Sequence, residues 1–108
     1  MKKRGDVWWV NFDPSVGSEI RKKRPAVIIS NNTSNKYLNR YQVVPLTSRT
    51  DKVYPGEALV SFDKKPAKAM CDQLTTISEK RCLNLAGQIS GTDMKLIDAA
   101  VKVQLGLD

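Results

Sequence analysis

Short apolar runs rich in β-branched and aromatic residues alternate with polar turns along most of the chain. Apolar runs bounded by Gly, Pro, Asn and Asp are typical of β-strands. This pattern predicts strands over residues 7–12, 25–30, 41–46, 57–62, 69–77 and 86–90. The polar segments 15–23 and 49–55 are predicted to be loops, and helical turns are expected near 36–38 and 78–81.

The last part of the chain follows a helical period instead. Thr92 is the predicted N-cap, with Asp93 in the first turn, and Gly106 is predicted to end the helix. The apolar positions of this helix share one face, which we expect to pack in the core or in a dimer: Met94, Ile97, Val101 and Leu105. Five or six short strands followed by one helix predict a mainly β fold, a bent antiparallel sheet or small barrel, in a single domain of residues 1–108.

The charge balance favours a polyanionic partner. The chain carries 18 Lys and Arg against 11 Asp and Glu, a net charge of +7. Such a field attracts nucleic acid or an acidic protein; the alternative is a basic surface that only keeps a small protein in solution. No apolar run approaches the roughly 20 residues that a membrane helix needs, and no apolar segment follows the basic N-terminus. We therefore expect no membrane contact, no secretory signal and a cytoplasmic location.

The lack of histidine excludes most catalytic machinery. The chain has no His and two Cys, which removes Ser-His-Asp and Cys-His triads and His-ligated metal sites. It contains no P-loop and no dinucleotide fingerprint, and its acidic residues are scattered. We expect no metal and no cofactor. Cys71 and Cys82 are expected to be free buried thiols, with a disulfide as the alternative.

The side chains that remain suit one reaction, attack of an RNA 2′-hydroxyl on the neighbouring phosphate. This cleavage needs a proton acceptor, cations for the charge that develops on the phosphorane, and a donor for the leaving 5′-oxygen. Arg24 precedes Pro25, which gives it a more fixed origin than its basic neighbours in the loop. Thr47 and Ser48 end a strand and can direct hydroxyls at a phosphate. The structural alternative is a solvated basic loop and a turn capped by Thr and Ser.

Aromatic residues provide candidate stacking surfaces for the bases of single-stranded RNA. Trp8 and Trp9 are neighbours in a predicted strand and face opposite ways, so at most one can line a given surface. At least one of them is expected to pack in the core or in a dimer. Lys52 and Tyr54 follow Thr47 in the next loop, where they contact either flanking bases or only solvent.

Six short motifs follow one another along the chain, and the similarity that they indicate extends over residues 4–105. They are Arg4-Gly5-Asp6-Val7-Trp8, Asp13-Pro14, Gly17-Ser18-Glu19, Arg24-Pro25-Ala26-Val27-Ile28, Val44-Pro45-Leu46-Thr47-Ser48 and Cys71-Asp72-Gln73-Leu74-Thr75-Thr76-Ile77. Together they resemble the MazF/PemK toxin family. The resemblance implies a small SH3-like barrel of the CcdB/PemK/MazF type with a C-terminal helix, a homodimer, and metal-independent, sequence-selective cleavage of single-stranded RNA. Such cleavage leaves a 2′,3′-cyclic phosphate and a 5′-hydroxyl and inhibits translation and growth.

The resemblance also implies roles for four residues. Arg24 matches the arginine that relatives need for cleavage, and we expect it to stabilise the phosphorane or to donate a proton. Thr47 matches the hydroxyl residue beside it and is expected to position the phosphate. Glu19 matches the acidic residue of a Gly-x-Glu loop, and Asp72 matches an aspartate that the PemK branch uses as a base. A guanidinium is a poor base, so Glu19 or Asp72 is expected to accept the 2′-hydroxyl proton; alternatively, Asp72 makes only a structural hydrogen bond.

The chain departs from the PemK branch at two positions. Ser18 replaces a histidine and Met70 replaces an arginine, so the mechanism of that branch does not transfer intact. The further residues expected to bind substrate are Ser18, Ser48, Lys23, Gln73 and Lys52.

The resemblance implies a protein partner as well, an acidic antitoxin whose disordered C-terminal segment lies across the RNA groove. Two rival functions stay open, a gyrase poison of the CcdB type and a non-catalytic SH3-like module that binds RNA or protein. The chain lacks the Trp-Gly-Ile ending of the gyrase poisons and keeps Arg24 and Thr47, which disfavours the first rival. The basic charge supports the second rival as well as it supports a nuclease.

Overall fold

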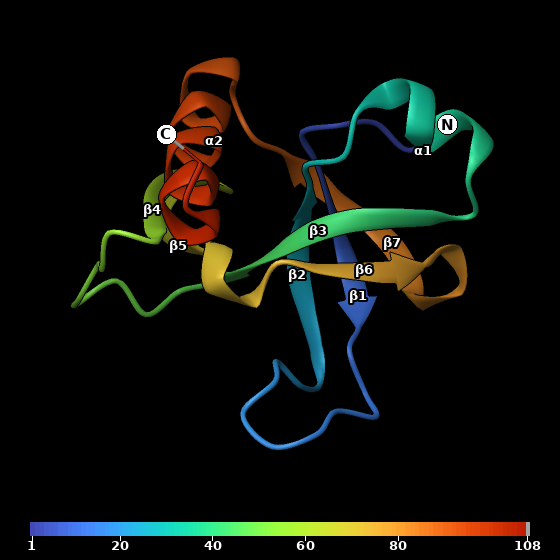
Figure 1. Cartoon of the computed structure of the whole chain (residues 1–108), viewed down its shortest axis with the longest axis horizontal. Coiled ribbons are helices and arrows are strands. Elements are labelled where there is room, and N and C mark those ends of the chain that lie inside the picture. Colours follow the sequence, from blue (N-terminus) through green and yellow to red (C-terminus); the bar gives the residue numbers. More distant parts are fainter. Residues whose placement is uncertain (108) are drawn as a thin grey trace.

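The computed structural model describes residues 1–107 as a strongly bent antiparallel sheet packed against one long helix (Figure 1). The strands are β1 (Asp6–Asn11), β2 (Lys23–Ile28), β3 (Arg40–Thr47), β4 (Glu57–Phe62), β5 (Lys65–Met70), β6 (Thr75–Ser78) and β7 (Cys82–Gln88). The helices are α1 (Asn32–Tyr37), α2 (Gly91–Leu105) and two short 3₁₀ turns, η1 (Cys71–Gln73) and η2 (Glu79–Arg81). The expected mainly β fold with a C-terminal helix is confirmed.

Strand β3 connects the two halves of the sheet. The sheet order is β4-β5-β3-β2-β1-β7, and β6 pairs with β3 off this path. The pairing of β3 with β2 ends where Pro45 lies opposite Ala26; a proline has no N–H to donate to a ladder. Beyond it, Leu46 and Thr47 pair with β5. Figure 1 shows β3 running from the α1 side of the molecule to the α2 side.

The single strand predicted over residues 69–77 is wrong, because this segment forms β5 and β6 with η1 between them. Both strands pair with β3 in succession. Leu46 and Val43 are three positions apart on β3, whereas their partners Ala69 and Thr75 are six positions apart. The segment between these partners is therefore three residues longer than the matching part of β3. The additional residues form η1, which does not pair with β3.

The other strand predictions are confirmed with local corrections. The strand at 57–62 has the predicted bounds, and those at 7–12, 25–30 and 41–46 shift by one or two residues at each end. Strand β7 begins at Cys82 rather than at residue 86, because β1 pairs with it along most of its length. Asp63 and Lys64 make the β4–β5 turn, both with positive φ, and β5 begins at Lys65.

Helix α2 begins earlier than predicted. Its N-cap is Ser90, whose hydroxyl accepts a hydrogen bond from the backbone N–H of Asp93 at 3.1 Å. The prediction of Thr92 as the cap is therefore wrong: the serine three residues before the acidic side chain takes that place. Gly106 ends the helix in the left-handed conformation at φ 71°, as predicted.

Apolar side chains fill both faces of the bent sheet. The cluster on the α2 face includes Val7, Val27, Val44, Leu46, Val60, Ala69, Met94 and Ile97. The cluster on the other face consists of Val10, Phe12, Ala26, Ile28, Tyr41, Val43 and Ile77. Val101 packs at the margin of the first cluster, but Leu105 is 52% exposed, so the predicted helix stripe does not reach the core at its end.

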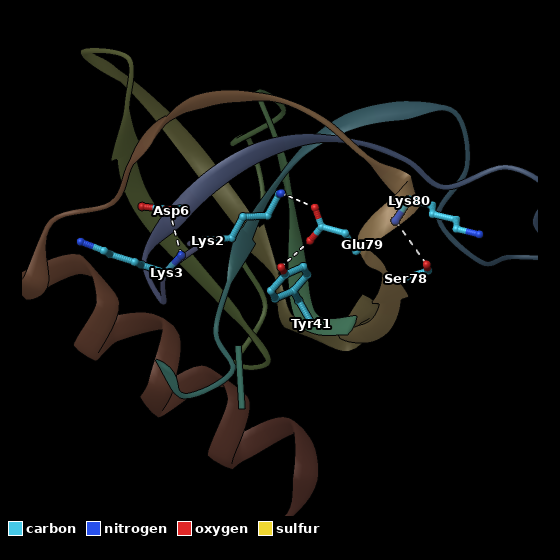
Figure 2. A network of polar contacts seen from close by, with 7 residues as sticks. All are labelled: Lys2, Lys3, Asp6, Tyr41, Ser78, Glu79 and Lys80. Carbon is cyan, nitrogen blue, oxygen red and sulfur yellow. Dashed lines mark hydrogen bonds and ion pairs between the residues drawn. The ribbon is translucent and has the colours of Figure 1, made fainter. Parts of the chain in front are cut away.

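A polar network ties the N-terminal segment to the end of β6. The carboxylate of Glu79 accepts hydrogen bonds from the Lys2 ammonium and from the Tyr41 hydroxyl (Figure 2). Burial alone would raise the pKa of Glu79, but the two hydrogen bonds and the charge of Lys2 together lower it. Burial and the neighbouring carboxylate raise the pKa of Tyr41.

The two cysteines are free thiols. Burial raises the pKa of Cys71 to about 12 and that of Cys82 to about 11, so both stay protonated and weakly reactive near neutral pH. Cys71 is buried as expected, whereas Cys82 is only half-buried. None of the helices within residues 1–107 is both long and apolar enough to cross a membrane.

Candidate functional site

Arg24 and Thr47 lie just beyond the point where β2 and β3 stop pairing. The last pair joins Ala26 to Pro45, and Arg24 and Thr47 each lie two positions further on, where Thr47 pairs with Lys68 of β5. Both residues line the same two surface hollows. The fold therefore brings together a guanidinium and a hydroxyl that the sequence places 23 residues apart. Both residues are half-buried.

A hollow of about 360 Å³ opens at this pair, and we call it the basic hollow. Its lining residues are Ile20, Arg24, Thr47, Arg49, Asp51, Lys52, Tyr54, Lys68 and Met70. Four of these nine residues are cationic and one is acidic. Cations grouped around a hydroxyl suit a phosphodiester, because guanidinium and ammonium groups bind phosphate oxygens. Of the residues expected to bind substrate, Lys52 lies here.

A second hollow, of about 400 Å³, also contains Arg24 and Thr47, and we call it the tryptophan hollow. Its lining residues are Trp9, Lys22, Lys23, Arg24, Pro25, Leu46, Thr47, Ser48, Phe62, Asp63, Lys65, Pro66 and Ala67. The expected substrate-binding residues Lys23 and Ser48 lie here. Trp9 is 39% exposed, whereas Trp8 packs against the core with the Lys2 ammonium 4.4 Å from its ring. Of the two tryptophans, Trp9 is therefore the one that offers a stacking surface beside Arg24.

The two candidate bases lie in a third hollow, of about 310 Å³, which we call the acidic hollow. Its lining residues are Phe12, Pro14, Ser15, Glu19, Ile20, Asp72, Gln73, Leu74, Thr75, Thr76, Ile77 and Arg81. Ile20 lines both this hollow and the basic hollow, so the β1–β2 loop separates Glu19 and Asp72 from Arg24. Glu19 accepts a hydrogen bond from the N–H of Val16 at 2.8 Å, and Asp72 is exposed at the start of η1.

Gln73 holds the β1–β2 loop in place. Its side-chain oxygen accepts a hydrogen bond from the N–H of Ile20 at 3.0 Å, and its side-chain nitrogen donates to the carbonyl oxygen of Ser18 at 3.3 Å. The three residues displaced at η1 bring this amide to the loop. Gln73 and Ser18, both expected to bind substrate, are thus joined to each other.

The same loop also orients Arg24. The Nε–H of Arg24 donates to the carbonyl oxygen of Arg21 at 3.1 Å. The guanidinium keeps its two terminal nitrogens for other acceptors, the fork geometry that matches two oxygens of a phosphate. A continuous path therefore runs from Gln73 through the loop backbone to the arginine that was expected to carry the chemistry.

Sequence reasoning missed Lys68, which lines the basic hollow. Lys68 lies opposite Thr47 on the β3–β5 ladder, and its ammonium is 3.2 Å from the carboxylate of Glu57. The sequence contains a signal for this lysine, because Ala67 and Ala69, both buried, alternate with Lys68 as in a strand with one buried face. The predicted strand began at residue 69 and therefore left Lys68 outside it.

The described residues offer a defined set of chemical groups. Within residues 1–107, no three His, Cys, Asp or Glu side chains lie where they could together hold a metal ion. What the site does contain is cations and a hydroxyl in the basic hollow, an indole beside them, and two carboxylates across the β1–β2 loop. Such a set can bind a polyanion, stabilise a developing phosphorane and move protons.

Comparison with protein families and with curated proteins gives consistent matches. A family described as "PemK-like, MazF-like toxin of type II toxin-antitoxin system" matches residues 3–105. The chain is 36% identical over 116 residues to Endoribonuclease MazF9 of Mycobacterium tuberculosis, with 99% of this chain and 98% of the relative covered. It is 34% identical over 103 residues to Endoribonuclease toxin MazF of Escherichia coli K12, with 94% and 92% covered.

Solved structures share the fold. An endoribonuclease in complex with its cognate antitoxin, from a mycobacterial species, has a TM-score of 0.83 at 21% identity, with 100% of this chain and 98% of that chain covered. MazF from Deinococcus radiodurans has a TM-score of 0.84 at 22% identity, with 97% and 96% covered. The barrel-like arrangement expected from the sequence is therefore that of these proteins.

Proposed function

The chain belongs to the PemK-like, MazF-like toxins of type II toxin–antitoxin systems, and from that premise we propose that it is an endoribonuclease acting at the Arg24–Thr47 pair. Its substrate is single-stranded RNA, cut at selected sequences without a metal ion. Cleavage of messenger RNA in the cytoplasm blocks translation and growth. The relatives named as endoribonucleases, which match nearly the whole chain, support this activity.

In this proposal each residue of the pair has one role. The scissile phosphate lies in the basic hollow, where Thr47 positions it through its hydroxyl. The guanidinium of Arg24 stabilises the charge that develops as the 2′-oxygen attacks the phosphorus and the bond to the 5′-oxygen breaks. The leaving 5′-oxygen takes up a proton from solvent, so that the products are a 2′,3′-cyclic phosphate and a 5′-hydroxyl. Support comes from the two hollows that both residues line and from the cations around them.

Glu19 and Asp72 are the candidate acceptors of the 2′-hydroxyl proton. Both side chains carry a carboxylate, which can accept a proton, and both line the acidic hollow beside Ile20. We propose that RNA crosses the β1–β2 loop, so that the nucleotides on either side of the cut occupy the basic and acidic hollows. Lys23, Ser48 and Trp9 then contact the strand in the tryptophan hollow.

The observation that carries the proposal is the placement of Arg24 and Thr47 together in a cationic hollow. The test is incubation of the purified protein with a long unstructured RNA in excess EDTA, beside an Arg24→Ala variant of equal stability. We expect discrete cuts that carry 5′-hydroxyls and that disappear in the variant. Cleavage that persists in Arg24→Ala, or binding without any cut on several RNAs, contradicts it and favours a binding module.

We also propose that the toxin is a homodimer and that an acidic antitoxin inhibits it. The net charge of +7 supports attraction of an acidic segment to the groove that binds RNA. Apolar side chains left exposed between α2 and β4, among them Leu59, Leu96 and Val103, support a second copy on that side. Sedimentation showing only monomers at micromolar concentration, with Leu96→Lys sedimenting identically, contradicts the dimer.

A further inference from the structure

Lys68, which lines the basic hollow, forms an ion pair with Glu57 that the proposed mechanism does not use. The ammonium of Lys68 lies 3.2 Å from Oε2 of Glu57, and the two side chains are only 13% and 11% exposed. Removing two charges from water carries a desolvation cost, which is recovered only if the remaining donors and acceptors also find partners. The other partners of this pair therefore indicate what it does.

Those partners belong to one segment, the β3–β4 loop of residues 48–56. The Lys68 ammonium donates a hydrogen bond to the carbonyl oxygen of Lys52 at 3.0 Å. Oε1 of Glu57 accepts a hydrogen bond from the N–H of Tyr54 at 2.9 Å. The backbone N–H of Glu57 also donates to the carbonyl oxygen of Tyr54 at 2.8 Å. The ion pair thus holds the loop at two points, Lys52 and Tyr54.

The two points lie beside the reacting groups. Lys68 is directly opposite Thr47 on the β3–β5 ladder, so the ion pair starts from the strand position next to the expected phosphate. Lys52 and Tyr54 line the same hollow as Arg24. The ring of Tyr54 is 60% exposed, which leaves its face accessible. The position of this loop relative to Thr47 therefore depends on Glu57 and Lys68.

We propose that Glu57 and Lys68 are positioning residues that hold the β3–β4 loop against the nucleotide beside the cut. The inference rests on the proposed RNA cleavage and adds the residues that set its affinity and its preference for neighbouring bases. Neither side chain touches the reacting atoms. Each acts through the backbone of Lys52 or Tyr54, so its loss weakens substrate binding and base preference more than it slows the bond-breaking step.

The test compares Lys68→Met with two controls. Lys68→Arg keeps a cation that can reach both Glu57 and the carbonyl oxygen of Lys52, and Lys95→Met removes one exposed charge from α2. Two readouts are measured on each variant: hydrogen exchange of the Tyr54 amide without RNA, and KM and kcat on RNAs that differ beside the cut. A thermal unfolding curve confirms that each variant is folded.

For Lys68→Met we expect Tyr54 exchange about tenfold faster and KM raised about tenfold with kcat within about threefold of the original protein. The preference for one base at a position beside the cut becomes weaker in Lys68→Met and is restored in Lys68→Arg. Lys95→Met changes neither Tyr54 exchange nor KM nor base preference. If Lys68→Met does not fold, Glu57→Gln is used, because it keeps the side-chain volume and loses the ion pair.

Four results overturn the inference. Tyr54 exchange unchanged in the variant shows that the pair does not hold the loop. KM and base preference unchanged show that the pair does not affect the substrate. A change of the same size in Lys95→Met shows that only net charge matters. An original protein that cuts no RNA overturns the proposed function together with this inference, whereas a cutting protein that is indifferent to Lys68 overturns this inference alone.

Discussion

Arg24 and Thr47 each lie two positions beyond the last pair of β2 and β3, Ala26 with Pro45, and both line the basic hollow and the tryptophan hollow. After Pro45, β3 leaves β2 for β5, so that Thr47 pairs with Lys68, while Arg24 stays paired with Val10 of β1. The two strands therefore separate where the guanidinium and the hydroxyl lie. A phosphate can approach both groups at this opening.

We predict that RNA cleavage depends on the hydroxyl of Thr47 and not on its methyl group. Its oxygen accepts from the N–H of Arg49 at 3.2 Å, which leaves the hydroxyl proton for a phosphate oxygen. A hydrogen bond to a charged group contributes about 1.5–3 kcal/mol, so Thr47→Val should lower kcat/KM by about 10- to 100-fold. Thr47→Ser should stay within about threefold. Steady-state cleavage of a short RNA measures both, and equal losses in the two variants would assign the effect to packing.

Amide substitutions are predicted to identify the general base. Glu19→Gln and Asp72→Asn each remove one carboxylate from the acidic hollow with little change in volume. Loss of the true base should lower kcat by about 10²- to 10⁴-fold. The other substitution should keep kcat within about threefold of the original protein. If both variants keep the original kcat, neither carboxylate accepts the proton.

Gln73 is predicted to act on Arg24 through the β1–β2 loop. Gln73→Glu keeps the acceptor for the N–H of Ile20 but loses the donor to the carbonyl oxygen of Ser18. A neutral hydrogen bond contributes about 0.5–1.5 kcal/mol, so kcat/KM should fall by up to about tenfold. Cleavage of the loop by a protease should become faster in the variant. Unchanged protease resistance together with a loss of RNA affinity would instead make Gln73 a direct RNA ligand.

Glu79 is predicted to stabilise the fold only above acidic pH. Its pKa is lower in the folded protein than in the unfolded chain, because the hydrogen bonds from Lys2 and Tyr41 outweigh burial (Figure 2). Its contribution is therefore complete above the ordinary glutamate pKa of about 4.3 and is lost as pH falls through the folded value.

Urea unfolding of the original protein and of Glu79→Gln measures this effect, with the exposed Asp51→Asn as the control. The difference in free energy of unfolding at pH 7 should shrink toward zero near pH 3. A difference that is the same at both pH values would assign the effect of Glu79 to packing and not to its charge.

The alternation of apolar and polar residues predicted most of the sheet but not its interruption. The strand at 57–62 lies between Gly56 and the Asp63-Lys64 turn, so its bounds could be predicted from local signals. Residues 69–77 contain no comparable break, and the three residues displaced at η1 follow from how β3 pairs with β5 and β6. That register depends on contacts between segments far apart in the sequence, so a local pattern of apolar and polar residues does not predict it.

For the candidate site, too, the sequence predicts some of the residues but not how they come together. Arg24 and Thr47 could be named from motifs, but their apposition depends on the β2–β3 register. The contacts of Gln73 with the loop depend on the displacement at η1. Lys68 was missed because the strand that carries it was placed too late in the sequence. The residue types predict which chemical groups the site can contain, whereas the pairing of the strands decides which of these groups lie together.

The most direct test of the account is single-turnover cleavage of a short RNA that contains one mapped cut site, beside the same RNA with a single 2′-deoxy nucleotide on the 5′ side of the cut. The account predicts that the deoxy substrate binds with similar affinity and is not cut. The original RNA should yield a 2′,3′-cyclic phosphate, at a rate lowered about 10²- to 10³-fold by Arg24→Ala. Cleavage of the deoxy substrate, or a product with a 5′-phosphate, would show that water and not the 2′-hydroxyl attacks, and would contradict the account.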